Sequence, residues 1–503
     1  MLFSSEFFVL VFLPTVWLGY QSMLRMAWPR AAAAWLVISS LVFYSWFEPL
    51  HLLLLLGMIV GNYGAGLVLA RLPQGRRRLL LTLAIGADLG ILAYYKYANF
   101  LIANLNALSP LELGFQTIVL PIGISFFTFQ LVAWLVDAHK GAARDYGFLD
   151  FCLFVCFFPQ LIAGPIVHHA EMIPQFRQLA SRRPGAADIA GGLILFTIGL
   201  FKKIVIADHV APIADSVFAA AETGASLDPL SAWCGTLAFT VQIYFDFSAY
   251  SDMALGMGLL FGIRLPINFA SPYKAVSIID FWRRWHITLS RFLRDYVYIP
   301  LGGNRRGPSR RHVNLLATML IGGLWHGAAW TFVAWGALHG LYLVVNHAWQ
   351  VRRDRLGLPA GCLGPAGPWL ARSLTFFCVA AAWVFFRAES FGGAAAILAG
   401  LAGATAGAPT ANATVGAGEL VLLLAILAGT WFLPNAPEIA AAFRPALEPV
   451  PEKPVARLVR RLVEAPTAVP LVAGVATSSA LVLVLAYQGF NIDRMQAFIY
   501  FQF

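Results

Sequence analysis

Long apolar runs recur along the sequence and restrict the possible folds of this chain more than any other feature. Several of them reach the roughly 17–25 residues with which a helix crosses the hydrocarbon part of a bilayer. Because 59% of the 503 residues are hydrophobic and only 12% are charged, a soluble protein with a single core is excluded. The sequence therefore predicts an all-α, polytopic membrane protein with about ten or more membrane helices.

Charges in the short loops predict how the spans are oriented. The loops at residues 21–30 and 71–78 carry arginine, whereas residues 48–50 and 98–116 contain neither lysine nor arginine. Loops with an excess of positive charge stay in the cytoplasm. The N-terminus is therefore predicted outside the cytoplasm, and a last span near residues 469–488 places the C-terminus there as well.

Two apolar segments do not read as simple spans. Residues 149–166 are interrupted by proline, and residues 313–347 have arginines at both ends with His326 in the interior. Irregular backbone is tolerated at membrane depth where protein buries it or where it lines a cavity. We therefore expect both segments to re-enter the membrane, the second as a hairpin with His326 near its bend. Residues 208–231, which contain no Lys or Arg, are expected to form an external loop.

The most basic part of the chain is residues 264–312, which contain ten Lys and Arg residues and two aspartates. We expect a cytoplasmic block of amphipathic helices whose arginines anchor the protein to membrane lipid. Alternatively, the arginines around the turn at residues 301–304 bind a phosphate-rich donor such as coenzyme A, helped by the amides of Gly302 and Gly303. Nucleic acid is not an expected partner. The candidate donor-binding residues are Arg283, Arg284, Asn304, Arg305 and Arg306.

Two histidines are the strongest candidates for catalysis. His326 lies inside an apolar segment, and titratable groups at membrane depth are often functional. His286 lies in the stretch WRRWHITLS, which reads as an amphipathic surface helix leading to the same cavity. A neutral imidazole can act as a general base while a second polar group holds a carbonyl or an oxyanion. The alternative is that each histidine is hydrogen-bonded in the core.

Other polar residues in apolar surroundings have more than one interpretation. Asp246 and Asp252, in the helical stretch 244–262, either line a polar tunnel, bind a proton, hold an arginine, or belong to a structural hydrogen-bond network. His168 and His169 follow a Gly-Pro break, but neither a carboxylate nor another histidine lies at ligand spacing in the sequence. We therefore expect no metal site there.

The stretches RRWHITLSRFLRDYVYIPLGG and GGLWHGAAWTFVAWGALHG resemble the signature of the membrane-bound O-acyltransferase family. The N-terminal MLFSSEFFVLVFLP, FDFSAYSDMALG and the C-terminal FIYFQF resemble its bacterial alginate O-acetyltransferase branch. The resemblance implies one membrane domain over residues 1–503, with a core at 117–347 and a helical ring around a central tunnel. It also implies that His326 is the catalytic histidine and that His286 is the second polar position.

The same resemblance implies a function. Acetyl groups would pass from acetyl-CoA across the bacterial inner membrane to an exported polysaccharide such as alginate, with periplasmic partner proteins of the SGNH acetyltransferase type. Cellulose and peptidoglycan are alternative acceptors. A transporter or channel without acyl chemistry, and a scaffold for active partners, are the rival interpretations.

The C-terminal tail, residues 498–503, is similar to the FxYxxF ending of the small membrane peptide of D-alanyl-transferring systems in this family. In that peptide the tyrosine is proposed to accept the acyl group. The resemblance therefore implies that Tyr500 is a covalent acetyl relay activated by His326. The alternative is that the aromatic end of the chain only docks at the membrane interface.

Overall fold

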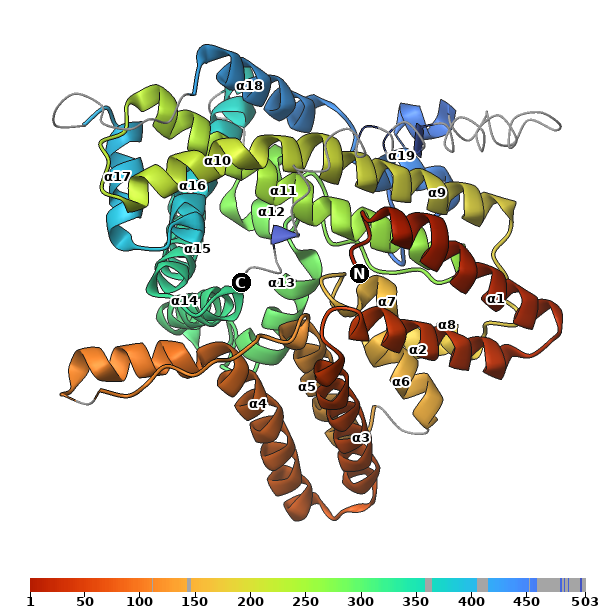
Figure 1. Cartoon of the computed structure of the whole chain (residues 1–503). Coiled ribbons are helices and arrows are strands. Elements are labelled where there is room, and N and C mark those ends of the chain that lie inside the picture. Colours follow the sequence, from red (N-terminus) through yellow and green to blue (C-terminus); the bar gives the residue numbers. More distant parts are fainter. Residues whose placement is uncertain are drawn as a thin grey trace. The chain divides into compact units, whose positions relative to one another are not determined.

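The computed structural model describes residues 1–110, 112–142, 146–357, 364–404, 415–451 and 453–458, together with residues 480, 481, 484, 487, 498 and 499. Every regular element in this part of the chain is a helix (Figure 1), and its only β pairing is a single bridge between Leu265 and Ala446. The prediction of an all-α protein is confirmed. The chain divides into two compact units, which we describe separately.

The first unit contains Met1–Leu200, Ala249–Ile267 and Ala436–Phe490. Proline lies in the first turn of several of its helices, where the missing N–H costs no hydrogen bond. A π-helical turn, Phe8–Phe12, leads into the first of them. The helices are α1 (Leu13–Arg25), α2 (Pro29–Ser45), α3 (Pro49–Arg71), α4 (Gln74–Leu108), α5 (Ile124–His139), α6 (Phe148–Cys156), α7 (Phe158–Leu161), α8 (His169–Arg177), most of α9 (Ala186–Phe201), and α19 (Ala436–Ile439).

The interrupted apolar segment 149–166 forms a broken helix within the first unit. Helix α6 ends at Cys156, and α7 begins at Phe158 with Pro159 in its first turn. All residues from 151 to 167 are buried. The irregular backbone is therefore covered by protein, as a segment that re-enters a membrane requires.

The second unit contains Phe201–Ser248, Asn268–Asn435 and Asn491–Phe503. Helix α11 (Pro229–Leu260) contributes residues to both units. The other helices of the second unit are α10 (Asp208–Glu222), α12 (Ile278–Trp282), α13 (Ile287–Leu293), α14 (Gly307–His326), α15 (Trp330–Arg355), α16 (Gly367–Arg387), α17 (Phe391–Leu401) and α18 (Ala417–Phe432).

The predicted hairpin is present, with His326 at its bend. Helix α14 ends at His326, α15 begins at Trp330, and the two helices lie side by side (Figure 1). Glycine makes this close approach possible: a Cβ atom at Gly323 would meet the backbone of Phe332, and one at Gly336 would meet the backbone of Met319. Small residues at such interfaces are typical of helices that pack inside membranes.

The prediction of an external loop at residues 208–231 is wrong for its first part. The chain stays helical from α9 through a π-helical turn, Lys202–Ala207, into α10, which ends only at Glu222. Two physical causes favour the helix. The segment 214–222 is rich in alanine, the strongest helix former. In addition, the Asp208 carboxylate forms an ion pair with Lys203 across the turn, so its charge does not require water.

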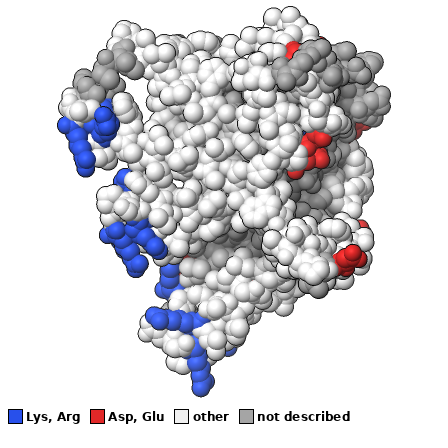
Figure 2. Space-filling model, turned by 90° about the vertical axis from the view of Figure 1, so that its left-hand side faces the viewer, with Lys and Arg blue, Asp and Glu red and all other residues white. Residues whose placement is uncertain are grey.

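Several helices are suited to a bilayer. Among the described residues, five are long and apolar enough to cross a membrane, or six if the bent pair Ala417–Phe432 and Ala436–Phe443 counts as one span. Helix α5 is apolar but shorter, and the predicted span near 469–488 lies largely outside the described residues. Most of the face in Figure 2 consists of residues without charge, and large leucines such as Leu50 and Leu79 are exposed. The chain is a multi-pass membrane protein.

Candidate active site

His326 lies in an aromatic environment at the end of α14. Its side chain is buried, and its ring centroid is 5.0 Å from Trp335 of the facing helix α15 and 5.1 Å from Phe386 of α16. The backbone can turn sharply just after it, because Gly327 packs against the ring of Phe332 where a side chain would not fit. The hairpin therefore holds this histidine at its bend, below the surface of the second unit.

His286 is fully buried and has an unusual backbone conformation. It precedes α13 with φ at 42°, in the left-handed region that non-glycine residues seldom adopt. The backbone N–H of Ile287 donates to the carbonyl of Asn268, and the N–H of Ala270 donates to the carbonyl of Arg284. The segment at residues 268–270 thus holds the chain on both sides of the histidine and stabilises its strained conformation.

The expected amphipathic surface helix around His286 is therefore wrong. Helix α12 ends at Trp282 and α13 starts at Ile287, so the histidine lies in a break between two short helices and not on one helical face. The cause is a partner distant in sequence. Asn268 precedes the histidine by 18 residues, is itself fully buried, and replaces the hydrogen bonds that a continuous helix would have made.

Asn268 also determines which nitrogen of His286 carries the proton. The side-chain oxygen of Asn268 accepts hydrogen bonds from the backbone N–H and the hydroxyl of Thr288, at 3.4 and 2.9 Å. The Nδ1 atom of His286 lies 3.1 Å from the same oxygen. Because an amide oxygen only accepts, Nδ1 must donate and therefore carries the hydrogen. In the neutral ring, Nε2 is then the nitrogen that can act as an acceptor or a base.

The structure brings the two candidate histidines together. The ring centroids of His286 and His326 are 6.5 Å apart, and Trp325 contacts both rings. On its other side, His286 packs against Phe247 of α11 at 4.8 Å. Helices α11 and α14 and the break before α13 therefore meet at one buried imidazole pair.

Burial lowers the pKa of His286 from 6.5 to about 3, because the charged imidazolium would lose its hydration. A base with a lowered pKa in the folded state stabilises the fold fully above the pKa of the unfolded chain and loses that stability as the pH falls. We expect the free energy of unfolding to be flat above about pH 6.5 and to decrease by about 2 kcal/mol by pH 5. Thermal unfolding in detergent between pH 5 and pH 8, compared with His286→Asn, measures this. If the stability of the two proteins depended on pH in the same way, the lowered pKa of His286 would be contradicted.

The predicted donor-binding residues are differently placed. The Arg284 guanidinium donates to the Asp280 carboxylate at 2.8 Å and to the carbonyl of Ala270, so part of its hydrogen-bonding capacity holds the backbone beside His286. Four other candidates are exposed and available to a ligand from solution: Arg283, Asn304, Arg305 and Arg306.

The glycine amides expected to help bind an anion already have acceptors. The N–H of Gly302 donates to the carbonyl of Ile299, and the N–H of Gly303 donates to that of Tyr298. The two glycines instead allow a tight turn, with φ at 111° and 53°. That part of the prediction is wrong, because the turn uses its own donors.

Tyr500, the candidate acyl relay, lies outside the described residues. Its two neighbours on the N-terminal side are described, and both are buried: Phe498 and Ile499. Both belong to the same compact unit as the histidine pair.

His339 is a buried histidine to which the sequence analysis assigned no role. It lies on α15 one turn after Trp335, and the two rings are 4.9 Å apart, so a single tryptophan separates it from His326. The spacing of four residues between Trp335 and His339 places both on one helical face, and this spacing could have identified His339 from the sequence. The ring of Trp282 also contacts His339, at 5.2 Å.

A second polar cluster lies in the first unit. His168 Nε2 and His169 Nε2 are 2.7 and 3.2 Å from the same carboxylate oxygen of Asp137, a residue of α5. The sequence shows no carboxylate at ligand spacing from these histidines, but the tertiary structure brings one from 31 residues away. The three ligand atoms lie within 4.8 Å of one another, a spacing that could hold a metal ion. Hydrogen bonds also account for this arrangement: the N–H of Ala170 donates to His168 Nδ1, and the Tyr146 hydroxyl lies 3.3 Å from His169 Nδ1.

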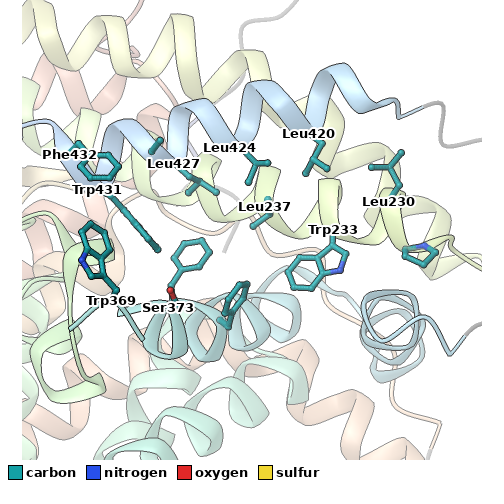
Figure 3. A pocket seen from close by; sticks show the side chains of 14 residues that line it. Leu230, Trp233, Leu237, Trp369, Ser373, Leu420, Leu424, Leu427, Trp431 and Phe432 are labelled. Atoms are coloured by element: carbon teal, nitrogen blue, oxygen red, sulfur yellow. The ribbon is translucent and has the colours of Figure 1, made fainter. Parts of the chain in front are cut away.

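An apolar cavity of about 680 Å³ lies between α11, α16 and α18 (Figure 3). Leucines of α18, among them Leu424 and Leu427, face Trp233 of α11 and Trp369 of α16 across it. Its lining contains no titratable side chain. The cavity therefore offers no acid or base for catalysis.

Comparison with known proteins indicates acyltransferase activity. The sequence model of the membrane-bound O-acyltransferase family matches residues 2–380. A peptidoglycan O-acetyltransferase of Helicobacter pylori is 44% identical over 432 residues, covering 80% of each chain. A probable alginate O-acetylase AlgI of Pseudomonas aeruginosa is 42% identical over 402 residues, which are 78% of this chain and 72% of that protein. A teichoic acid D-alanyltransferase of Streptococcus thermophilus is 28% identical over 48% of this chain and 60% of its own length.

Proposed function

The chain belongs to the membrane-bound O-acyltransferase family, and we propose that it passes acetyl groups from acetyl-CoA across the bacterial inner membrane for O-acetylation of an exported polysaccharide. The observation that carries the proposal is the buried pair of His286 and His326 at the bend of the α14–α15 hairpin. A pair of neutral imidazoles in an apolar site can remove a proton from a hydroxyl and return it to a leaving group.

In the proposed reaction, His326 takes the proton of an attacking hydroxyl as its oxygen bonds to the carbonyl carbon of the thioester. The C–S bond then breaks, and the imidazolium returns the proton to the leaving thiolate, which departs as the free thiol. An ester and a thiol replace an alcohol and a thioester, so no oxidant or metal is required. Removal of the proton by a general base is worth about 10²- to 10⁴-fold in rate.

We assign His286 to orientation. Its Nδ1–H is committed to Asn268, which leaves Nε2 as an acceptor. A neutral ring in this tautomer cannot donate a hydrogen bond to an oxyanion. It can instead accept one from the attacking hydroxyl or from the ring of His326, and thereby align the proton to be transferred. This favours orientation over oxyanion stabilisation.

Exposed arginines beside the hairpin suit the phosphates of the donor. Arg305 and Arg306 immediately precede α14, the helix that ends at His326, and Arg283 is a further candidate. Arginine binds phosphate in a bidentate manner, and such contacts hold the donor without entering the transition state. We propose that these residues, with Asn304 and the free face of Arg284, bind the coenzyme A moiety.

The double variant Arg305→Ala/Arg306→Ala is expected to raise KM for acetyl-CoA about tenfold with little change in kcat. The reason is that the lost contacts bind the substrate and the transition state equally, so the rate of the chemical step does not change. Steady-state thiol release measures both constants. Arg352→Ala/Arg353→Ala, a pair of basic residues in the last turn of α15, is the matched control. A fall in kcat at unchanged KM would contradict a role in donor binding.

For the second half of the reaction, we propose that Tyr500 receives the acetyl group and that a periplasmic partner of the SGNH acetyltransferase type transfers it to the polymer. A relay of this kind suits a C-terminus outside the cytoplasm. The relatives named for alginate and for peptidoglycan modification support an exported glycan as the final acceptor. The identity of this glycan is then a property of the partner, and one membrane unit can serve several acceptors.

The proposed function is tested by measuring whether the protein cleaves the thioester of acetyl-CoA. Purified protein in lipid nanodiscs is given acetyl-CoA with a radiolabelled acetyl group, and release of free thiol is measured with label transfer to protein. An acetyltransferase consumes the thioester and produces one thiol for each acetyl group lost. A transporter or channel leaves the thioester intact, so movement of a solute through the protein without thiol release would overturn the proposal.

A further inference from the structure

Three charged side chains form a buried cluster in the second unit. The ammonium of Lys203 lies 2.8 Å from a carboxylate oxygen of Asp208 and 2.7 Å from one of Asp246. The side chains are only 2%, 6% and 3% exposed. Lys203 and Asp208 lie where the π-helical turn joins α10, whereas Asp246 comes from α11. The cluster therefore joins two long helices deep inside this unit.

The C-terminal tail completes this cluster. The backbone N–H of Ile499 donates to the second carboxylate oxygen of Asp246 at 2.6 Å. The ring of Phe498 lies over the Lys203 ammonium, with the nitrogen 4.7 Å from the ring centroid. Buried charge is tolerated only when it is paired and hydrogen-bonded. The tail supplies an N–H dipole to the carboxylate and an aromatic face to the cation, so it matches both signs of the cluster.

Asp246, which holds the tail, is connected to the histidine pair through a short series of contacts. Asp246 is followed directly by Phe247, whose ring packs against His286 at 4.8 Å, and the ring of His286 lies 6.5 Å from that of His326. Ile499 is followed directly by Tyr500. A shift of α11 at Asp246 would therefore move both the residue before Tyr500 and the packing of His286.

From these contacts we propose that the Lys203–Asp208–Asp246 cluster is the docking site for the C-terminal tail and that Asp246 is the positioning residue of the acyl relay. The cluster fixes the backbone one residue before Tyr500. The consequence for acyl transfer rests on the proposed function of Tyr500, whereas the docking itself does not. Among the interpretations of Asp246 that the sequence left open, the proposal corresponds to the hydrogen-bond network. This network would hold the tail in place.

The sharpest variant removes the donor and leaves the cluster intact. Ile499→Pro deletes the N–H that Asp246 accepts, and Ile499→Ala, which keeps the N–H, is its matched control. Because Ile499 lies outside the named helices, we expect these helices to fold as in wild type. Carboxypeptidase treatment of the protein in nanodiscs, followed by the release of Phe503 and Gln502, measures whether the tail is held.

We expect the proline variant to lose these two residues about tenfold faster than wild type, the size of effect typical of losing a hydrogen bond to a charged group. The alanine variant should stay within about twofold of wild type, because its hydrogen bond persists. Asp246→Ala should release the tail in the same way, and Asp246→Asn, which retains an acceptor oxygen, should restore part of the protection. Asp252→Ala controls for the loss of another buried carboxylate from α11.

The amount of acetyl label on the protein shows whether Asp246 positions Tyr500 or only packs against the tail. If Asp246 positions Tyr500, Ile499→Pro and Asp246→Ala lose label on the tail about tenfold or more, while KM for acetyl-CoA is unchanged. A tail equally protected in all variants overturns the docking. A released tail with undiminished label overturns the positioning role. If Tyr500→Phe leaves polymer acetylation unchanged while Ile499→Pro still frees the tail, the relay fails and the docking site remains.

Discussion

Replacing His326 by alanine is expected to lower the rate of acyl transfer by about 10²- to 10⁴-fold, because the attacking hydroxyl loses its general base. None of its three closest ring neighbours, Trp325, Trp335 and Phe386, can accept a proton. Thiol release from acetyl-CoA and acetylation of the polymer should fall together, since one proton transfer serves both. The initial rate of thiol release by purified protein in nanodiscs is the measurement.

Two further variants separate chemistry from folding in this experiment. His326→Gln keeps the size and polarity of the side chain in its aromatic environment, and it should be as inactive as alanine while unfolding near the wild-type temperature. His312→Ala, a histidine on the same helix four turns earlier, should keep its activity. Thiol release by His326→Gln at the wild-type rate would rule out His326 as the base and leave His286 as the remaining candidate of the pair.

The hairpin is the part of the site that the sequence predicts best. Arginines at both ends of residues 313–347 predict that both ends face the same side of the membrane, and the glycines near the middle of the segment permit a close turn. These are local features, visible within one window of sequence. The structure accordingly shows α14 ending at His326 and α15 returning from Trp330.

The surroundings of His286 could not be predicted in the same way. Periodicity in WRRWHITLS favours a helix, but Asn268 overrides it through hydrogen bonds that span 18 residues. The approach of Asp137 to His168 and His169 has the same character, because a carboxylate on one helix meets imidazoles from another. Local patterns report on faces and spans, whereas the partners of buried polar groups come from tertiary structure, which one sequence does not reveal.

The tail presents the extreme case. Phe498 and Ile499 follow Lys203 and Asp246 by more than 250 residues, and only the folded chain brings them together. The family resemblance drew attention to the tyrosine, yet it gave no indication of what holds it. Asp246 of α11, which the sequence left with several interpretations, accepts a hydrogen bond from the residue before this tyrosine.

Tyr500→Phe is expected to abolish acetyl label on the protein and to reduce polymer acetylation by about 10²-fold or more, because a covalent step loses its nucleophile. Phenylalanine keeps the ring, so docking of the tail through Asp246 should be unaffected, and the release of Phe503 by carboxypeptidase should match wild type. Slow thioester hydrolysis should persist, since His326 can still activate water. The measurement is label retained on denatured protein after incubation with radiolabelled acetyl-CoA.

Tyr487→Phe is the matched control, a second tyrosine near the C-terminus that should keep both label and polymer acetylation. Label that survives in Tyr500→Phe would place the acyl group on another residue, and unchanged polymer acetylation would show direct transfer from the thioester to the acceptor. Loss of label in both Tyr500→Phe and His326→Gln, with hydrolysis lost only in the latter, would separate the two roles. His326 would then act on any hydroxyl that reaches it, and docking of the tail would decide that this hydroxyl is the phenol of Tyr500.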